Sequence, residues 1–399
     1  MTASFTLGRL PRITFGSGGF AGVPGVVAGH GRRVLLVTGG RSLAASGRRD
    51  ELLAGLASAG VAVVGEVAVT DEPSPAVVDA AVAANLATGA DVVLGVGGGS
   101  VLDAAKAIAG LLRTGASVVE HLEGLPGMRP YGGPSVPLVA VPTTAGTGSE
   151  ATRNAVISQR GPAGYKRSFR DERLVAADAV VDPDLLAGNG RDRITTNGMD
   201  ALTQLLEAYT SLRAGPLTDA LALSGLEAAR DGLLAWHADP DGPGSADARS
   251  RMAYAALLSG ICLAHAGLGA VHGLASPLGA QFPVPHGAAC GATLAAVTAT
   301  NIGALVERDP GSPVLERYAR LGRLLGGLPE ATGGAEARAG LVVTLSEWTA
   351  LLGVQRLRAF GIGEAAIPAI VADSRGSSMR TNPIVLTDEE IAGILAATI

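Results

Sequence analysis

Four polar side chains in an apolar part of the sequence have the chemistry of a metal site. Asp200 and Gln204 lie four residues apart in NGMDALTQLLEAY, so a helix would place both on one face. His272 and His286 belong to a stretch, residues 252–306, that contains no Asp, Glu, Lys or Arg. Carboxylate, carbonyl and imidazole groups bind divalent metals such as Fe²⁺ or Zn²⁺. Each histidine taken alone is more simply explained as a hydrogen-bonded core residue, but four polar groups together in this apolar context favour a metal site, which we predict.

A glycine-rich turn has the composition of a phosphate-binding loop. The segment DVVLGVGGGS, residues 91–100, reads as a buried strand, three glycines and the start of a helix. Gly97, Gly98 and Gly99 let the backbone approach a ligand closely, and the helix N-terminus at Ser100 attracts an anion such as pyrophosphate. The alternative is a tight strand-to-helix turn that needs glycine only for its backbone angles.

A second polar loop follows another expected strand. The segment PTTAGTGSE, residues 142–150, supplies the hydroxyl groups of Thr143, Thr144 and Thr147, and it is otherwise an ordinary polar loop. Ligands of parallel sheets bind at the carboxyl ends of the strands. Two such loops after successive strands therefore favour a nucleotide site.

The lysines are few and both lie in the same half of the chain. Of 31 Lys plus Arg residues, only Lys106 and Lys166 are lysines. Asp103 and Lys106 share a face of the helix expected after the three glycines, where they are able to pair. Lys166 lies in YKRSFR and is expected near the same crevice. Because arginine lacks the compact ammonium group, we expect both lysines to have a function there, the alternative being compositional bias.

The elements that must position these residues fall into two halves. In residues 1–182, β-rich runs alternate with Ala- and Leu-rich helical segments. This alternation predicts an α/β dinucleotide-binding domain with a doubly wound parallel sheet. In residues 183–399, strand-like runs are scarce, and we predict an all-helical domain that carries the metal and catalytic site.

Composition narrows the classes of function. With 47% hydrophobic and 17% charged residues, the 399-residue chain is too apolar for disorder, and a net charge of −5 gives no attraction for nucleic acid or an anionic membrane. Histidines, prolines and glycines interrupt residues 252–306, so we expect a buried helical core there rather than a membrane span. Two cysteines without a CxxC motif, and no recognisable signal peptide, favour the cytoplasm.

Taken together, the motifs resemble one enzyme family. GGGSVLDAAK, PTTAGTGSE, NGMDALxxxxEAY and GLGAVHGLASPLGAxxxVPHG, in this order, are similar to the iron-containing (group III) alcohol dehydrogenases, and the resemblance covers nearly the whole chain. It implies an α/β nucleotide-binding domain and a helical domain, an architecture shared with dehydroquinate synthase, with the active site in the cleft between them. The cofactor site expected from the loops and from the resemblance comprises Gly97, Gly98, Gly99, Ser100, Asp103, Thr143, Thr144, Thr147 and Lys166.

The chain departs from the family pattern at two positions of the metal site. The family holds its metal with one Asp and three His, and Asp200, His272 and His286 match three of these ligands, whereas Gln204 replaces the fourth. A further family histidine, often assigned to proton relay, is Ser276 here. A glutamine carbonyl is a poorer partner than imidazole for Fe²⁺ or Zn²⁺. The resemblance thus leaves open a weakened site, another ion, or a metal-independent enzyme like the maleylacetate reductases.

The turn after the first central strand bears on the choice of cofactor. Family members that use NAD often carry an aspartate there, but residues 37–42 read VTGGRS. Gly39 removes the carboxylate that would repel a 2′-phosphate, and Gly40, Arg41 and Ser42 would complete the site. We predict a preference for NADP(H), with NAD(H) possible.

These observations predict a NAD(P)H-dependent oxidoreductase that interconverts a small aldehyde or ketone and an alcohol by hydride transfer. Asp200, His272 and His286 are the catalytic residues, either as metal ligands or, without metal, through a protonated histidine that polarises the carbonyl. A homodimer is the family expectation. The rivals are a metal-independent maleylacetate reductase-like enzyme, a dehydroquinate synthase-like lyase, and an inactive nucleotide-binding homologue. The lyase is disfavoured because its site is richer in lysine.

Overall fold

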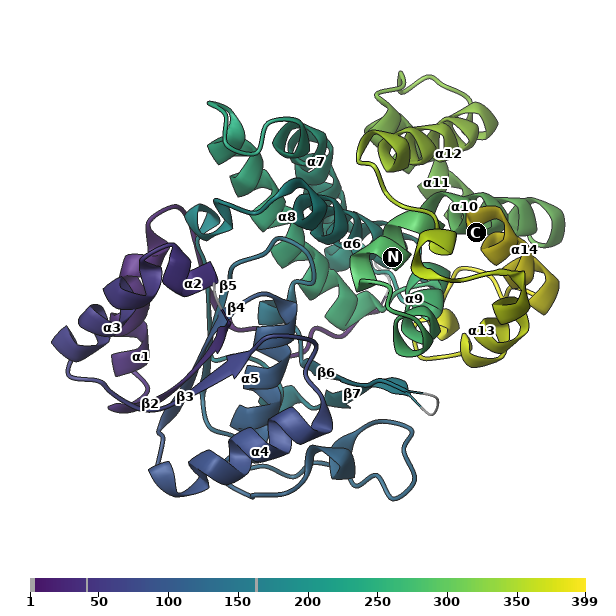
Figure 1. The fold of residues 1–399 in the computed structure, drawn as a ribbon. Coiled ribbons are helices and arrows are strands. Elements are labelled where there is room, and N and C mark those ends of the chain that lie inside the picture. The colour runs from purple at the N-terminus through teal and green to yellow at the C-terminus, as the bar shows by residue number, and fades with distance from the viewer. Residues whose placement is uncertain (1–3, 41, 162–163) are drawn as a thin grey trace. The chain divides into compact units, whose positions relative to one another are not determined.

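The structure, a computed structural model, describes residues 4–40, 42–161 and 164–399 (Figure 1). The chain divides into two compact units. One comprises Gly8–Ala187, and the other comprises Gly188–Ile399 together with the N-terminal residues up to Leu7. The domain boundary that we expect after residue 182 stays a prediction.

A six-stranded sheet forms the centre of the unit Gly8–Ala187, in the order β1-β8-β5-β4-β2-β3. Its strands are β1 (Arg12–Phe15), β2 (Arg33–Gly39), β3 (Ala62–Val69), β4 (Val92–Gly97), β5 (Leu138–Pro142) and β8 (Asp178–Val181). Every neighbouring pair in it is parallel. The connecting helices are α1 (Val23–Ala28), α2 (Ser42–Ala45), α3 (Arg48–Ser58), α4 (Pro75–Asn85) and α5 (Gly99–Leu111).

Alternate residues of the central strands enter two separate cores. Leu35 and Val37 of β2 pack with α4 and α5, whereas Val34 and Leu36 pack with α1 and α3. Because successive side chains of a strand point to opposite faces, a strand buried on both faces needs a continuous apolar run. Figure 1 shows the two groups of helices around the sheet. The predicted doubly wound parallel sheet is confirmed.

A second, two-stranded sheet carries one of the two lysines. Strands β6 (Asn154–Gln159) and β7 (Tyr165–Arg170) are antiparallel, with Ser158 opposite Lys166. Strand β6 packs against α5, the helix that follows the three glycines. The hairpin therefore belongs to the α/β unit.

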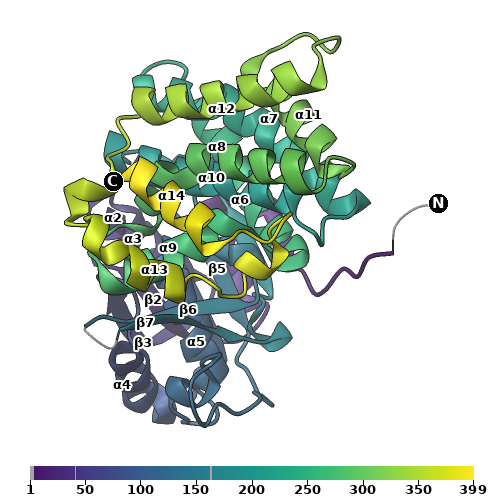
Figure 2. The same cartoon turned by 90° about the vertical axis from the view of Figure 1, so that its right-hand side faces the viewer.

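The second unit is helical, as predicted, and its described residues contain no β-strand. Its helices are α6 (Arg191–Thr210), α7 (Pro216–Ala238), α8 (Ser245–Ala266), α9 (Ala270–Gln281), α10 (His286–Arg308), α11 (Val314–Gly326), α12 (Gly334–Leu351), α13 (Ile367–Asp373) and α14 (Asp388–Thr398). Helix α6 lies at the centre and packs against α7, α8 and α10. Figure 2 shows α10 between α12 and α14, both of which it contacts.

One helix in the described part of the chain is long and apolar enough to cross a membrane. This is α10, and the bent pair of α8 and α9 passes the same test of length and composition. Buried residues make up 56% of the apolar window of α10, as in the core helix of a folded domain. The absence of a membrane partner stays a prediction.

Candidate metal and cofactor sites

Four potential metal ligands converge in the helical unit. Asp200 lies on α6, His272 on α9, and His286 and Cys290 on α10. One donor atom from each lies within 4.8 Å of the other three. Asp200, His272 and Cys290 are buried, and His286 is half-buried. The structure thus brings together three residues predicted from the sequence and adds Cys290, which sequence reasoning missed.

Local sequence explains how the helices present these groups. On α6, Asp200, Gln204 and Glu207 recur at helical spacing, so they share one face. Helix α9 begins directly after Gly269, where an added Cβ would lie 2.8 Å from a carboxylate oxygen of Glu207. Glycine therefore lets the start of α9 pack onto α6. Helix α10 begins at His286, so Cys290 lies one turn further on the same face.

A buried carboxylate orients His272. The Nδ1 atom of His272 lies 2.6 Å from Oε2 of Glu207, and Oε1 of Glu207 accepts a hydrogen bond of 2.6 Å from the backbone N–H of Val271. This contact holds a proton on Nδ1 and leaves Nε2 facing the cluster, 3.2 Å from Oδ1 of Asp200. Histidine ligands of metals usually donate their second N–H to such a carboxylate. Sequence reasoning gave Glu207 no role, although it belongs to the motif NGMDALTQLLEAY.

Charges within the cluster shift its pKa values. Burial alone would raise the pKa of Asp200, but His286, His272 and Gln204 together lower it. Burial also opposes the imidazolium of His272, yet Cys290, Glu207 and Asp200 raise its pKa well above the ordinary value. Burial raises the pKa of the Cys290 thiol more than His272 lowers it. A bound cation would need deprotonated ligands, so binding would release protons.

Gln204 turns its amide nitrogen toward Asp200. Its Nε2 atom donates a 3.1 Å hydrogen bond to Oδ1 of Asp200, while its carbonyl oxygen accepts one of 3.0 Å from Ser259 on α8. An amide nitrogen is a donor with no acceptor capacity. In this orientation Gln204 does not offer a ligand atom to the cluster, and its predicted role as a ligand requires the amide to rotate.

The glycine turn and the threonine loop pack against each other in the α/β unit. Strand β4 ends at Gly97, opposite Pro142 at the end of β5. An added Cβ at Gly98 would lie 3.1 Å from Oγ1 of Thr144, and one at Gly99 would lie 2.7 Å from Cγ2 of Thr147. No side chain caps the start of α5 at Gly99. The two loops form a glycine-lined cradle at a helix N-terminus, which is suited to a phosphate.

Lys106 is a buried structural residue. Its side chain is 0% exposed, and its three N–H groups face four oxygens within hydrogen-bond distance, those of Ser149 (2.7 Å), Thr152 (2.8 Å) and Asp103 (3.2 Å) and the backbone oxygen of Asn154 (2.5 Å). These bonds tie α5 to the chain between β5 and β6. The expectation of a cofactor-related role for Lys106 thus gives way to a structural explanation. Asp103 also accepts a bond from Ser149, and its direct contact with the cofactor stays a prediction.

Lys166 is held by an acidic partner. Its ammonium group donates to Glu72 over 2.8 Å, and Ser158, opposite Lys166 in the hairpin, donates to the other oxygen of Glu72 over 2.6 Å. The Lys166 side chain is 12% exposed. These bonds order the ammonium group, and its predicted contact with the cofactor remains to be tested.

The turn after β2 is only partly described. Gly39 ends the strand, and an added Cβ there would lie 3.8 Å from the nearest side chain, that of Val101. At Gly40 an added Cβ would lie 2.8 Å from Thr70. Arg41 and the side chain of Ser42 lie outside what the structure describes, so their predicted roles at a 2′-phosphate have no structural counterpart here.

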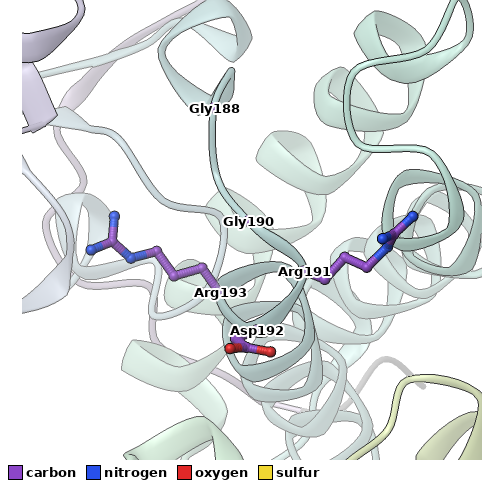
Figure 3. A pocket seen from close by; sticks show the side chains of 5 residues that line it. All are labelled: Gly188, Gly190, Arg191, Asp192 and Arg193. Atoms are coloured by element: carbon purple, nitrogen blue, oxygen red, sulfur yellow. The ribbon is translucent and has the colours of Figure 1, made fainter.

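A surface hollow at the start of α6 is distinct from both sites. Its lining consists of Gly188, Gly190, Arg191, Asp192 and Arg193. Figure 3 shows Arg191 and Arg193 pointing to opposite sides of the helix start. Arg191 donates to the backbone oxygens of His237 and Ala238, which fixes it to the end of α7. None of the predicted site residues belongs to this lining.

Comparisons with known proteins match the whole length of both units. Residues 11–183 match the family model of iron-containing alcohol dehydrogenase, and residues 194–399 match that of the C-terminal part of the Fe-containing alcohol dehydrogenase family. The chain is 32% identical to 1,3-propanediol dehydrogenase of Klebsiella pneumoniae over 91% of this chain and 90% of that protein. It is 31% identical to NAD-dependent methanol dehydrogenase of Bacillus methanolicus over 76% of each. A crystal structure of 1,3-propanediol oxidoreductase superposes with a TM-score of 0.87 at 28% identity, over 100% of both chains.

Proposed function

Because the chain belongs to the iron-containing alcohol dehydrogenase family, we propose that it interconverts a small alcohol and its aldehyde or ketone with a nicotinamide cofactor and a divalent metal. It is an NAD(H)-type alcohol–aldehyde oxidoreductase by family. The observation that carries the metal-dependent version is the convergence of Asp200, His272 and His286, with His272 oriented by Glu207. The names of two relatives, a methanol dehydrogenase and a 1,3-propanediol dehydrogenase, support a short-chain alcohol or diol as substrate.

The donor set of the helical unit fits a divalent cation. One carboxylate oxygen and two imidazole nitrogens face one another in a buried site. When bound, the ion supplies a Lewis acid that stabilises the developing alkoxide. Asp200 contributes the negative charge that offsets the cation, and Glu207 holds the ring of His272 in the tautomer that presents Nε2.

A metal-independent reductase is the second candidate, and one observation favours it. Both ring nitrogens of His272 lie beside carboxylates, Nδ1 at 2.6 Å from Glu207 and Nε2 at 3.2 Å from Asp200. Cys290 and these carboxylates raise the pKa of His272 despite burial, and such surroundings favour the protonated ring, which is able to polarise a carbonyl when no ion is bound. This candidate predicts turnover that chelators do not affect.

The cradle in the α/β unit fits the pyrophosphate of the cofactor. A Cβ at Gly97 or Gly99 would collide with Val101 or Thr147, so glycine lets the turn pack closely against the threonine loop, and the N-terminal N–H groups of α5 favour an anion there. We assign contacts with the rest of the cofactor to Ser100, Asp103, Thr143, Thr144, Thr147 and Lys166. When bound, the nicotinamide supplies or accepts the hydride, and the chain supplies binding and orientation.

For the choice of cofactor, we propose a preference for NADP(H) over NAD(H). Gly39 supports it, because the end of β2 lacks a carboxylate that would repel a 2′-phosphate. The relative from Bacillus methanolicus, however, is named for NAD. The substitution Gly39→Asp tests this preference, because an added Cβ there would lie 3.8 Å from Val101, at ordinary contact distance. It should lower kcat/KM for NADPH relative to NADH by about tenfold or more.

The control for that substitution is Gly39→Asn, which adds a side chain of the same size without the charge. Any loss caused by the added bulk alone should affect both cofactors alike. A wild-type protein that uses NADH and NADPH equally well, or a Gly39→Asp variant with an unchanged ratio of kcat/KM for the two cofactors, would contradict the proposed preference.

A homodimer, a cytoplasmic location and the absence of a nucleic-acid or membrane partner remain predictions from the sequence.

The proposed function is tested by following oxidation of NADH and NADPH with a panel of small aldehydes and ketones. The protein is assayed as purified, after dialysis against a chelator, and after addition of Zn²⁺ or of Fe²⁺ under anaerobic conditions, with Asp200→Asn alongside. We expect turnover that falls on chelation, returns with metal, and is lost in Asp200→Asn. Absence of both turnover with any carbonyl compound and nucleotide binding would contradict the proposed oxidoreductase activity. Turnover that is insensitive to chelation would favour the metal-independent candidate.

A further inference from the structure

The spacing of the four donors in the helical unit is close to that of a tetrahedral metal site. Zinc bonds of about 2.0–2.1 Å to nitrogen or oxygen and about 2.3 Å to sulfur place neighbouring donors about 3.3 Å apart, or about 3.6 Å when one is sulfur. Oδ1 of Asp200 lies 3.2 Å from Nε2 of His272 and 3.7 Å from Nε2 of His286. Sγ of Cys290 lies 3.7 Å from Nε2 of His272, 4.0 Å from Nε2 of His286 and 3.9 Å from Oδ1 of Asp200. Each of these distances lies within about 0.5 Å of the tetrahedral value.

Two sequence changes meet at this site. The family's third histidine ligand corresponds to Gln204, and Gln204 faces the cluster with an amide nitrogen, which does not bind metal. Its carbonyl oxygen is engaged by Ser259. Cys290, by contrast, directs its sulfur at both histidines and at Asp200 from one turn beyond His286 on α10. A thiol thus stands next to the position where an imidazole has been lost.

We propose that Cys290, and not Gln204, is the fourth protein ligand of the metal, and that its sulfur makes the site selective for zinc over iron. This inference rests on the metal-dependent version of the proposed function and specifies its ligand set. A thiolate is a soft ligand and suits Zn²⁺, whereas the site implied by the family offers only oxygen and nitrogen. Gln204 remains a hydrogen-bond donor to Asp200 and helps to fix its carboxylate.

Binding proceeds by proton release and involves no change of oxidation state. The cation displaces the thiol proton of Cys290 and any proton on Nε2 of His272, and both protons pass to water or buffer. A sulfur–metal bond and two nitrogen–metal bonds form, together with one to the carboxylate of Asp200. The Nδ1 proton of His272 stays on its bond to Glu207.

Cobalt substitution reads the sulfur ligand directly and independently of activity. The metal-free protein is titrated with Co²⁺, and the absorption spectrum is recorded. We expect one equivalent of Co²⁺ to give an intense near-ultraviolet thiolate-to-cobalt charge-transfer band together with the visible bands of tetrahedral cobalt. Substitution Cys290→Ser should abolish the charge-transfer band. The matched control is Cys262→Ser, which removes the other buried cysteine and should leave the band intact.

Affinity for zinc gives the second readout. Competition with a chromophoric chelator should show that Cys290→Ser weakens Zn²⁺ binding by at least about 100-fold, because loss of an outer-shell partner alone costs about 10–100-fold. Binding of Fe²⁺ should weaken much less, so the ratio of zinc to iron affinity falls. Gln204→Ala removes only an outer-shell donor to Asp200, so it should weaken zinc binding by no more than about 10–100-fold and by less than Cys290→Ser does. Thermal unfolding of the metal-free variants shows whether Cys290→Ser remains folded. If it does not, the Co²⁺ spectrum of the wild-type protein still tests for the sulfur ligand.

Three outcomes would overturn the inference. These are stoichiometric Co²⁺ binding without a charge-transfer band, a larger loss of zinc affinity in Gln204→Ala than in Cys290→Ser, and no binding of Zn²⁺ or Co²⁺ at all. Failure of the proposed function looks different. A thiolate band without any carbonyl reduction would support Cys290 as a ligand and contradict the proposed oxidoreductase activity. Metal-dependent turnover without the band would support that activity and contradict Cys290 as a ligand.

Discussion

The substitution Glu207→Gln should switch the tautomer of His272. As a carboxylate, Glu207 accepts two N–H groups, from Val271 over 2.6 Å and from Nδ1 of His272 over 2.6 Å. A glutamine has one acceptor oxygen, so one of these contacts must change. Leaving the backbone N–H of Val271 unpaired would cost about 1–3 kcal/mol. The less costly response keeps that bond and lets the new amide donate to Nδ1, which moves the ring proton to Nε2.

The moved proton occupies the nitrogen that faces the cluster. Nε2 then donates to Asp200, 3.2 Å away, and must lose its proton before it binds a cation. We expect the dissociation constant for Zn²⁺ to rise about 10–100-fold, which corresponds to about 1.4–2.7 kcal/mol. Chelator competition measures the constant, and ¹⁵N spectra of the imidazole nitrogens of the metal-free protein, recorded at a pH where the ring is neutral, report the tautomer. The control Glu227→Gln removes the same charge from an exposed position on α7. Zinc affinity within about twofold of wild type in a folded Glu207→Gln protein would refute this reasoning.

Two further predictions concern buried charges of the α/β unit. Lys106→Met removes the cation beside Asp103 and a donor to Ser149 and Thr152, so the free energy of unfolding in urea should fall by about 3–5 kcal/mol. Lys166→Met, at a partly exposed pair, should cost about 1 kcal/mol, and equal losses would contradict the structural role of Lys106. Burial of the Glu150 carboxyl group is the main reason why its pKa is raised from 4.5 to about 7. Its protonated form is favoured in the fold, so its contribution to stability is complete below about pH 4.5 and is lost as the pH rises through about 7, a loss of about 3 kcal/mol. Urea unfolding at several pH values between 5 and 8 should show this decline in the wild type and a flatter profile in Glu150→Gln, and parallel profiles would exclude the effect.

Much of the fold could be predicted because periodicity is a local property. Continuous apolar runs separated by helical segments require a sheet that is covered on both faces, and the six parallel strands follow. The sequence was enough to predict that Asp200, His272 and His286 share a site. Polar side chains in an apolar segment are costly to bury unless they have partners. Their convergence on one point, by contrast, depends on how α6, α9 and α10 pack, which no spacing in the sequence specifies.

The residues that were missed show where sequence reasoning ended. Glu207 gains its role from the start of α9, a contact between segments 64 residues apart. Cys290 lies one turn after His286 on α10, and a histidine and a cysteine four residues apart in a helical segment are a usable signal of two ligands on one face. The scarcity of lysine suggested a role at the cofactor for Lys106. Its helix α5 is buried nearly throughout, however, so the side chain enters the interior, where its compact ammonium group lies among the oxygens of Asp103, Ser149, Thr152 and Asn154.

The central claim is that Asp200, His272 and His286 hold a metal on which carbonyl reduction depends. The most direct measurement is the initial rate of aldehyde-dependent NADH or NADPH oxidation as a function of Zn²⁺ equivalents added to the metal-free protein. We expect a rate near zero without metal that rises linearly and levels off at one equivalent, with no such rise in Asp200→Asn. A full rate in the metal-free protein, or a rise that Asp200→Asn shares, would contradict it.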